Sequence, residues 1–351
     1  MNSFNNFYNV TKPLLQKSIN SFNDSILIEK IDLIKENLKI FTKLNKNGKM
    51  IRGVLVCLGY KLNNDKIDYS IPLATAYEVF ETSILVHDDI IDNDNLRRGQ
   101  QTIPYYNKLK YKNISNKDHF SNSIGICIGD YGLFKANEII INNYSNNNQI
   151  KKILSTYNNI VIDTIRGETL DVIIPFEEKN KISNNNLKIE DSILEIYKLK
   201  TAYYTLVGPL TLGMILGKNT NEEINDIKNF ALPLGIAFQI QDDLLGIYSD
   251  NKKIGKTIGS DIKEFKQTLL YSYTKQTKYY NELLRYYGKE ESSINEVKHI
   301  FDKCGAKEYC IDKMNELYNE SLNILNEITW LRKEDKEILN DLILYLKNRT
   351  K

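Results

Sequence analysis

The chain has 351 residues, of which 42% are hydrophobic, and this supplies enough apolar material for a large buried core. Lys and Arg total 47 against 45 Asp and Glu, so the formal net charge is only +2. Because the two signs are mixed along the chain, no general field favours nucleic acid as a partner. We find neither a signal-peptide core nor an apolar run of roughly 18 residues. We therefore expect a cytoplasmic protein that does not span a membrane.

Helical spacing of apolar residues dominates the first third of the chain. Apolar side chains recur at steps of three and four residues over 27–41, which predicts a helix there. Ser70 and Pro72 are start signals for a second helix that runs to Asp92. Its middle is apolar on most sides, as expected for a helix inside a large core. Residues 104–122 are polar and are predicted to form a loop.

The rest of the chain also favours helices, including 123–143, 150–174 and 189–216. The first of these carries three glycines whose spacing allows close helix packing or leaves room beside a ligand: Gly125, Gly129 and Gly132. The third is expected to bend at Gly208-Pro209. Thr220 and Glu223 fit a capping box at the start of another long helix. With no strand alternation, fixed repeat or linker, the sequence predicts an all-α protein whose residues 1–351 form a single domain.

The cysteines indicate a reducing compartment. The chain has 4 cysteines and none of them forms a CxxC pair. Cys57 and Cys127 lie in apolar runs, so we expect both to be free thiols in the core.

The stretch Val86-His87-Asp88-Asp89-Ile90-Ile91-Asp92 places acidic residues at the end of the second helix. Asp88 and Asp92 are four residues apart and therefore share one helix face. Two carboxylates on one face repel each other unless a cation lies between them. Oxygen ligands without cysteine or histidine suit magnesium, which also takes substrate phosphates as ligands. Taken alone, the motif fits a magnesium–diphosphate site and the acidic end of an ordinary helix about equally well.

A second aspartate pair decides between these two interpretations. Asp242-Asp243 also follows a long apolar helical pattern. Two such helix ends that face each other would hold magnesium ions between them, and the ions would make a diphosphate a good leaving group. Several cations suited to phosphate binding are spread along the chain: Lys49, Arg52, Arg97, Arg98, Lys200, Lys256 and Lys266. Apolar helix walls beside such a site suggest a substrate with an apolar tail and a diphosphate head.

With these motifs in this order, the sequence resembles the trans-isoprenyl diphosphate (polyprenyl) synthases, and most closely the geranylgeranyl and farnesyl diphosphate synthases. Residues 76–92 with Arg97-Arg98-Gly99 resemble the first aspartate-rich region of that family, and Phe238 to Asp243 resemble the second. The resemblance covers about residues 45–325. Further matching motifs fall in the family's order: Gly48-Lys49 with Arg52, Gly129-Asp130, Gly167 with Asp171, Lys200-Thr201, Gly255-Lys256 with Asp261, Lys266 with Thr268, and Gly305-Ala306 with Glu308-Tyr309.

The resemblance implies the isoprenoid synthase fold, a large helical bundle with a central apolar cavity, and a homodimer. It implies condensation of isopentenyl diphosphate with an allylic diphosphate (dimethylallyl, geranyl or farnesyl). The allylic C–O bond ionises, the isopentenyl double bond attacks the cation, and a proton is lost. Three magnesium ions are implied as the cofactor, with these ligand positions: Asp88, Asp89, Asp92, Asp242 and Asp243.

The resemblance also assigns roles to individual side chains. The allylic diphosphate would be gripped by Arg97, Lys200, Lys256 and Lys266. Isopentenyl diphosphate would be gripped by Lys49, Arg52 and Arg98. Thr201 and Gln239 would point oxygens at the allylic cation and stabilise its developing charge. Asp171 would help to order metal-bound water.

Four positions depart from the family pattern. Glu81 stands where the family usually has a His or Gln that contacts isopentenyl diphosphate. A carboxylate there should repel a diphosphate unless it is protonated or paired with Lys49 or Arg52. The other three departures are a glycine for a third aspartate, a phenylalanine for a glycine, and a proline for a histidine: Gly246, Phe265 and Pro104.

The helix before Asp88 also predicts the length of the product. Ser83, five residues before Asp88, is small, and Ile84 is four residues before it, where short-chain farnesyl synthases often place an aromatic. Phe80, eight residues before Asp88, is the nearest aromatic floor. Because one helical turn of about 5.4 Å is close to one isoprene unit, we expect a product longer than farnesyl, with geranylgeranyl diphosphate first.

Two alternatives remain open at this point. A terpene synthase with the same fold would cyclise a prenyl diphosphate without isopentenyl diphosphate, and Glu81 and Phe265 give this idea some support. A non-catalytic subunit of a heteromeric synthase is the other, although the intact Asp88, Asp92 and Asp242 argue against it.

Overall fold

The computed structural model describes residues 2–180, 182, 189–249, 259–289 and 293–349, and most of these residues are helical. The all-α prediction is confirmed. Within the described ranges no helix is long and apolar enough to cross a bilayer. The chain divides into two compact units, which are described separately. Unit 1 contains residues 5–155 and 209–219, and unit 2 contains residues 2–4, 156–208 and 220 onward. The single domain predicted from the sequence stays a prediction.

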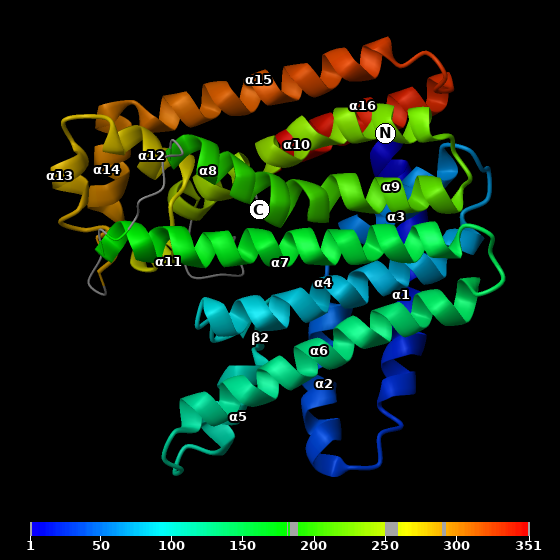
Figure 1. Ribbon diagram of the computed structural model, residues 1–351, viewed down its shortest axis with the longest axis horizontal. Helices are drawn as coiled ribbons and strands as arrows, with labels where there is room; N and C mark the ends of the chain where they lie inside the picture. The colour runs from blue at the N-terminus through cyan, green and yellow to red at the C-terminus, as the bar shows by residue number, and fades with distance from the viewer. Residues whose placement is uncertain (1, 181, 183–188, 250–258, 290–292, 350–351) are drawn as a thin grey trace. The chain divides into compact units, whose positions relative to one another are not determined.

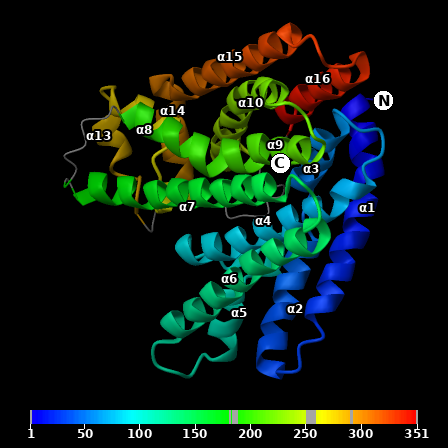
Figure 2. The same ribbon diagram turned by 45° about the vertical axis from the view of Figure 1, so that its right-hand side comes forward.

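Unit 1 is built around the long apolar helix α4 (Ile71–Ile91) and the helix α6 (Lys117–Tyr144), which lie side by side in Figure 1 and Figure 2. Its other elements are α1 (Ser3–Ile26, whose first two residues belong to unit 2), α2 (Asp32–Lys46), α3 (Ile51–Lys61), the short η1 (Asp68–Ser70), β1 (Leu96–Arg97), β2 (Gln100–Gln101), α5 (Ile103–Lys110), the first turn of α7 (Ile150–Asn180) and α9 (Gly208–Leu216).

Glycines bring α4 and α6 into close contact. A methyl group at Gly132 would lie 2.1 Å from Oγ of Ser83, and one at Gly129 would lie 2.2 Å from Nε2 of His87. Neither position has space for a side chain, so these glycines allow the acidic end of α4 to lie directly against α6. The sequence offered close packing as one of two readings of this spacing, and the structure supports it.

Two local predictions in unit 1 are wrong. Residues 104–122 are not a loop, because α5 begins at Ile103 and α6 begins at Lys117. Pro104 lies in the first turn of α5, and the Thr102 hydroxyl caps that helix by accepting a hydrogen bond from the Tyr105 N–H at 3.3 Å. Cys127 is exposed rather than buried, while Cys57 is buried as expected. The side of α6 that packs on α4 carries the glycines, and Cys127 points away from it.

A small β-hairpin presents the arginine pair. The strands β1 and β2 pair Leu96 with Gln101 and Arg97 with Gln100. Only Arg98 and Gly99 lie between the strands, and both have a positive φ, of 53° and 73°. This is the pattern of a type I′ turn, which strongly favours glycine at one of its two central positions. This hairpin was not predicted, because strands of two residues are too short to show an alternating apolar pattern.

Unit 2 is built around the helix α10 (Asn221–Tyr248), which packs on α15 (Ala306–Glu327) and on the irregular helix η2 (Tyr197–Val207). The Thr220–Glu223 capping box at the start of α10 is confirmed. The remaining elements are the rest of α7, α8 (Ile189–Ile196), α11 (Ser260–Lys263), α12 (Leu269–Lys275), α13 (Tyr280–Leu283), α14 (Ile294–Cys304) and α16 (Lys333–Lys347).

The η2 segment is wound as a π-helix, in which the backbone hydrogen bonds span five residues rather than the four of an α-helix. It carries Lys200 and Thr201 and ends where α9 begins at Gly208. The change from π-helical to α-helical winding thus falls at the Gly208-Pro209 pair, where the sequence predicts a bend. Pro209 cannot donate a backbone hydrogen bond to the preceding turn, which is consistent with the change of winding. π-helical turns are often found at functional sites, and here the turn carries two of the predicted site residues.

Phe265 occupies a backbone position that favours glycine. Its φ is +61°, in the left-handed region, and the resemblance predicts a glycine at this position. The strain is offset by burial, because the ring packs edge-on against Tyr271 and Tyr287, with ring centroids 5.4 and 5.7 Å apart. The left-handed turn that precedes Lys266 is thus kept with a different residue, and Phe265 becomes part of the aromatic core of unit 2.

Candidate active site

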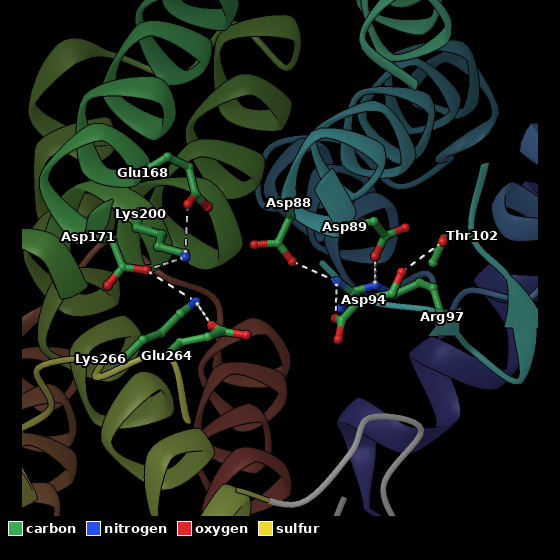
Figure 3. A network of polar contacts seen from close by, with 10 residues as sticks. All are labelled: Asp88, Asp89, Asp94, Arg97, Thr102, Glu168, Asp171, Lys200, Glu264 and Lys266. Atoms are coloured by element: carbon green, nitrogen blue, oxygen red, sulfur yellow. Dashed lines mark hydrogen bonds and ion pairs between the residues drawn. The ribbon is translucent and has the colours of Figure 1, made fainter. Parts of the chain in front are cut away.

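In unit 1, three carboxylates surround one buried arginine at the end of α4. Asp88 and Asp89 lie 2.7 and 2.6 Å from the guanidinium of Arg97, and Asp94 lies 3.0 Å from it. Figure 3 shows the three carboxylates pointing at this guanidinium, which β1 carries. The Thr102 hydroxyl fixes the loop by donating to the Asp94 carbonyl at 2.8 Å. The structure therefore places Arg97 as the counterion of the aspartate motif.

Burial destabilises the charged forms of the carboxylates at the end of α4. Burial, against the pull of Arg97, raises the pKa of Asp89 to about 7. One of its carboxylate oxygens, Oδ2, is buried without a hydrogen-bond partner. Asp92 caps the C-terminus of α4, where the negative end of the helix dipole also favours a cation. A hard, oxygen-only donor set at such a position suits magnesium.

The described carboxylates at either aspartate motif do not form a complete metal site by themselves. In the parts of the chain that the structure describes, no group of three Asp, Glu, His or Cys side chains could hold a metal ion. Magnesium keeps several waters and completes its shell with substrate phosphates, so one or two carboxylates per helix end are compatible with it. The residues present therefore fit a magnesium ion that is shared with a diphosphate.

Glu81 is paired with Arg52 and Arg98. Pairing with Arg52 is one of the conditions under which the sequence predicts that Glu81 does not repel a diphosphate. Its carboxylate lies 2.9 Å from Nη1 of Arg52 and 2.6 Å from Nη2 of Arg98. Two of the three residues predicted to bind isopentenyl diphosphate are thus together in unit 1. The third, Lys49, accepts a hydrogen bond from the Tyr8 hydroxyl at its backbone carbonyl, at 2.6 Å.

The residues predicted to set product length are all buried in α4. Phe80 is fully buried and packs edge-on against Tyr77, with ring centroids 5.4 Å apart. Ser83 donates to the Val79 carbonyl at 2.7 Å, and Ile84 is 6% exposed. Their role in product length stays a prediction.

In unit 2, two lysines and three carboxylates form a second network (Figure 3). Nζ of Lys200 lies 2.7 Å from Asp171 and 2.9 Å from Glu168. Nζ of Lys266 lies 3.5 Å from the same Asp171 oxygen and 3.5 Å from Glu264. The predicted residues Lys200, Lys266 and Asp171 are therefore brought together. Asp171 pairs with both ammonium groups and so keeps the two lysines close together. In this arrangement both lysines can bind the same anion.

A chain of hydrogen bonds links the other predicted residues of unit 2. The Thr201 hydroxyl donates to Oε1 of Gln239 at 2.6 Å, and the Gln239 amide donates to Asp243 at 2.8 Å. The Tyr197 hydroxyl donates to the other oxygen of Asp243. Burial, aided by Asp261, raises the pKa of Asp243 to about 7. Asp243 therefore acts within the protein to orient Gln239, and through it Thr201.

Asp242 is the more exposed member of the second pair and contacts a distant arginine. Its carboxylate is 41% exposed and forms an ion pair with Arg349, which follows α16. The Arg349 guanidinium also lies over the Phe238 ring, 4.0 Å from its centroid. Lys256 lies outside the described residues. At Gly246, a methyl group would lie 3.5 Å from Oδ2 of Asp261.

Comparison with known proteins identifies the family. The sequence model of the polyprenyl synthetase family matches residues 34–304. The chain belongs to the polyprenyl synthetase family. It is 27% identical over 340 residues to the geranylgeranyl diphosphate synthase of Sulfolobus acidocaldarius, which covers 94% of this chain and 93% of that protein. It is 30% identical over 246 residues to that of Saccharolobus solfataricus, with 68% of each chain covered.

Solved structures show that the polyprenyl synthetase fold is present. The geranylgeranyl pyrophosphate synthase of Corynebacterium glutamicum, complexed with isoprenyl diphosphate and magnesium, superposes with a TM-score of 0.87. The two proteins are 23% identical, and 99% of each chain is covered. A polyprenyl synthase from Caulobacter crescentus gives a TM-score of 0.78 at 20% identity, with 100% of this chain and 99% of that chain covered.

Several residues of these networks were not predicted as part of the site. Glu168 lies three residues before Asp171 on α7, so the helical spacing could have indicated that both share one face. Asp94 lies three residues before Arg97, which is a weaker signal in a loop. Arg349 is 107 residues from Asp242 in sequence, and no local pattern could have indicated this pair.

Proposed function

We propose that this protein is a trans-prenyltransferase that condenses isopentenyl diphosphate with an allylic diphosphate and releases a longer prenyl diphosphate. The observation that carries this proposal is the pair of separate networks, one built on the first aspartate motif with Arg97 and the other on two lysines suited to phosphate. One centres on Asp88, Asp89 and Arg97, and the other contains Lys200 and Lys266. The family match over 34–304 supports it.

The described side chains supply binding, orientation and electrostatics for this reaction. Lys200 and Lys266, held by Asp171, bind the allylic diphosphate and take up the negative charge of the departing pyrophosphate. Gln239, oriented by Asp243, and Thr201 stabilise the cation left behind. The isopentenyl double bond then forms the new C–C bond, and the proton lost from its C2 goes to the released pyrophosphate.

Magnesium is part of the proposal. When bound, it supplies Lewis-acid stabilisation of the pyrophosphate leaving group. The residues that would hold it are Asp88, Asp92 and Asp242, with Asp89 and Asp243 adjacent, and the predicted number is three ions. A magnesium complex of the Corynebacterium protein is consistent with this.

Geranylgeranyl diphosphate is the proposed product, because Ser83 and Ile84, five and four residues before Asp88, are not aromatic. The curated relatives include geranylgeranyl and farnesyl synthases, which supports a product in this range. A homodimer is proposed as the assembly. The cytoplasmic location predicted from the sequence stays a prediction.

One experiment tests this function against its alternatives. The purified chain is incubated with farnesyl diphosphate and magnesium, with and without labelled isopentenyl diphosphate. We expect elongation, with label in geranylgeranyl diphosphate, only when both substrates are present. A cyclic hydrocarbon formed without isopentenyl diphosphate would instead identify a terpene synthase. Absence of turnover under all conditions would indicate a subunit that needs a partner.

A further inference from the structure

Glu81 joins two arginines in unit 1 through a single oxygen. Its Oε1 atom lies 2.6 Å from Nη2 of Arg98 and 2.9 Å from Nη1 of Arg52. The glutamate side chain is only 6% exposed, whereas those of Arg52 and Arg98 are 20% and 19% exposed. Two guanidinium groups at this spacing would otherwise repel each other. The buried carboxylate therefore acts as the bridge that keeps the pair together.

The surrounding backbone fixes Arg98 in this position. Its Nη1 atom donates to the Leu44 carbonyl at 2.9 Å. A methyl group at Gly48 would lie 2.9 Å from the same nitrogen, so the glycine leaves room for the guanidinium. The turn that carries Arg98 is the two-residue hairpin between β1 and β2. The guanidinium is thus held at a defined place rather than extended into solvent.

A second acid keeps Glu81 charged. Glu78 lies one turn earlier on α4, is buried, and accepts a hydrogen bond from the Gly53 N–H at 2.6 Å. Burial and the nearby charge of Glu81 raise the pKa of Glu78 to about 8, which favours its neutral form. Burial alone would raise the pKa of Glu81, but Arg52 and Arg98 hold it below its ordinary value. Glu81 therefore carries a full negative charge beside the arginines at neutral pH.

We infer that Glu81 is an internal counterion that lowers the affinity of Arg52 and Arg98 for a diphosphate and so sets the Michaelis constant for isopentenyl diphosphate. The inference rests on the proposed function, which assigns these arginines to that substrate. A guanidinium has five N–H donors, and each arginine gives Glu81 one nitrogen in these contacts. An entering diphosphate must therefore share both arginines with a fixed negative charge.

Direct binding of inorganic pyrophosphate tests this inference without any turnover. Titration calorimetry at fixed ionic strength, without magnesium, compares the wild type with Glu81→Gln and Glu81→Asp. We expect Glu81→Gln to bind pyrophosphate about tenfold more tightly, because one opposing charge is removed. Glu81→Asp keeps the charge and should stay within about threefold of the wild type. Arg98→Gln should weaken binding in both backgrounds, which assigns the measured site to the arginine pair.

Steady-state kinetics supply a second, independent measurement. In Glu81→Gln the Michaelis constant for isopentenyl diphosphate should fall about tenfold, and that for the allylic substrate should stay within about twofold. Equal or weaker pyrophosphate binding by a folded Glu81→Gln variant overturns the inference, even if the wild type elongates normally. If the wild type does not elongate, the proposed function fails, while the pyrophosphate titration still decides the role of Glu81. Thermal unfolding of each variant checks that it is folded.

Discussion

Glu78 is a buried carboxyl group that stays protonated at neutral pH. Burial, and then the nearby charge of Glu81, raises its pKa from 4.5 to about 8, although Arg98 and Arg52 act in the other direction. The pKa in the folded state is therefore higher than that in the unfolded state. Its contribution to stability is fully present below about pH 4.5 and is lost as the pH rises through about 8.

Replacement of Glu78 by Gln should remove this pH dependence. The amide can still accept from Gly53, but it cannot ionise. We expect the wild type to lose about 3 kcal/mol of unfolding free energy relative to Glu78→Gln between pH 6 and pH 9. Urea denaturation of both proteins at the two pH values measures this. Parallel pH profiles would contradict the raised pKa.

Arg349 is expected to compete with magnesium for Asp242. It forms an ion pair with Asp242 and lies over the Phe238 ring, and the Gln241 amide holds this segment by donating to the carbonyls of Lys347 and Arg349 at 3.0 and 3.1 Å. A cation that binds Asp242 must therefore share or displace the guanidinium. Arg349→Ala should bind magnesium about threefold more tightly in a calorimetric titration without substrate.

A matched variant separates this effect from general loss of positive charge. Lys347→Ala removes a cation two residues away that lies over Tyr318. It should leave the magnesium affinity near that of the wild type. Equal affinities for Arg349→Ala and Lys347→Ala would show that the ion pair does not compete with the metal.

At the scale of elements, glycines position the irregular helix η2. A methyl group at Gly167 of α7 would lie 2.4 Å from the backbone nitrogen of Lys200, and one at Gly235 of α10 would lie 2.6 Å from Cα of Ala202. Backbone atoms cannot turn aside as a flexible side chain can, so the π-helix is held between two closely packed helices. This packing places Lys200 beside Asp171.

Gly167→Ala should therefore impair both stability and catalysis. Overpacking costs about 1–3 kcal/mol, and the gain in helix propensity recovers at most about 1 kcal/mol. We expect a lower urea midpoint and a loss of at least about tenfold in kcat, because displacement of Lys200 misplaces a phosphate ligand. Gly246→Ala is the control for stability, since among the described residues a methyl group there meets only Asp261, at 3.5 Å. Equal midpoints for the two variants would contradict the close packing.

Phe80 is expected to be the floor that ends product growth along α4. Its ring is fully buried and packs against Tyr77. Phe80→Ala removes the ring and should shift the products towards chains longer than geranylgeranyl, as measured by chromatography of the dephosphorylated prenols. Ile84→Val, a small change nearer to Asp88, is the control and should keep the wild-type product. An unchanged distribution in Phe80→Ala would count against Phe80 as the floor.

Local signals were sufficient for most helices and for the clusters that lie within each unit. The capping box at Thr220 and the apolar run before Asp88 are local patterns, and the structure confirms both elements. The loop predicted for 104–122 was wrong, because the prediction relied on the polar composition of this segment. It did not take into account Thr102 and Pro104, which are start signals for the helix α5. The π-helix η2 could not be predicted, since its winding depends on contacts with Gly167 and Gly235, which are distant in sequence.

At the scale of the whole molecule, long-range pairs were the part that the sequence could not supply. The ion pair between Asp242 and Arg349 joins residues 107 positions apart, so no local pattern could indicate it. The three carboxylates around Arg97 lie within nine residues of it in sequence, and its role as an allylic diphosphate ligand stays a prediction. The ordered motifs nevertheless indicated the family correctly, because their order along the chain is informative even where their contacts are unknown.

The proposed homodimer needs an apolar surface, and α6 offers one. Ile126, Phe134 and Ile141 are 49%, 76% and 47% exposed, and their spacing of eight and seven residues places them on one side of the helix. Large exposed apolar patches are rare on monomeric proteins, and where they occur they often mark protein–protein contacts. A charge placed in the middle of such a contact would have to be buried without a partner.

Phe134→Glu should therefore convert a wild-type dimer into a monomer, as measured by sedimentation velocity at micromolar concentration. Asn143→Glu is the matched control: it adds the same charge to an exposed position of α6, nine residues further on and thus on the opposite side of the helix. It should leave the dimer intact. A wild type that sediments as a monomer would refute the homodimer, and a Phe134→Glu variant that stays dimeric would move the interface away from this row. Because the row and the aspartate motif belong to the same unit, a monomer that retains activity would show that the dimer is not needed to complete the site.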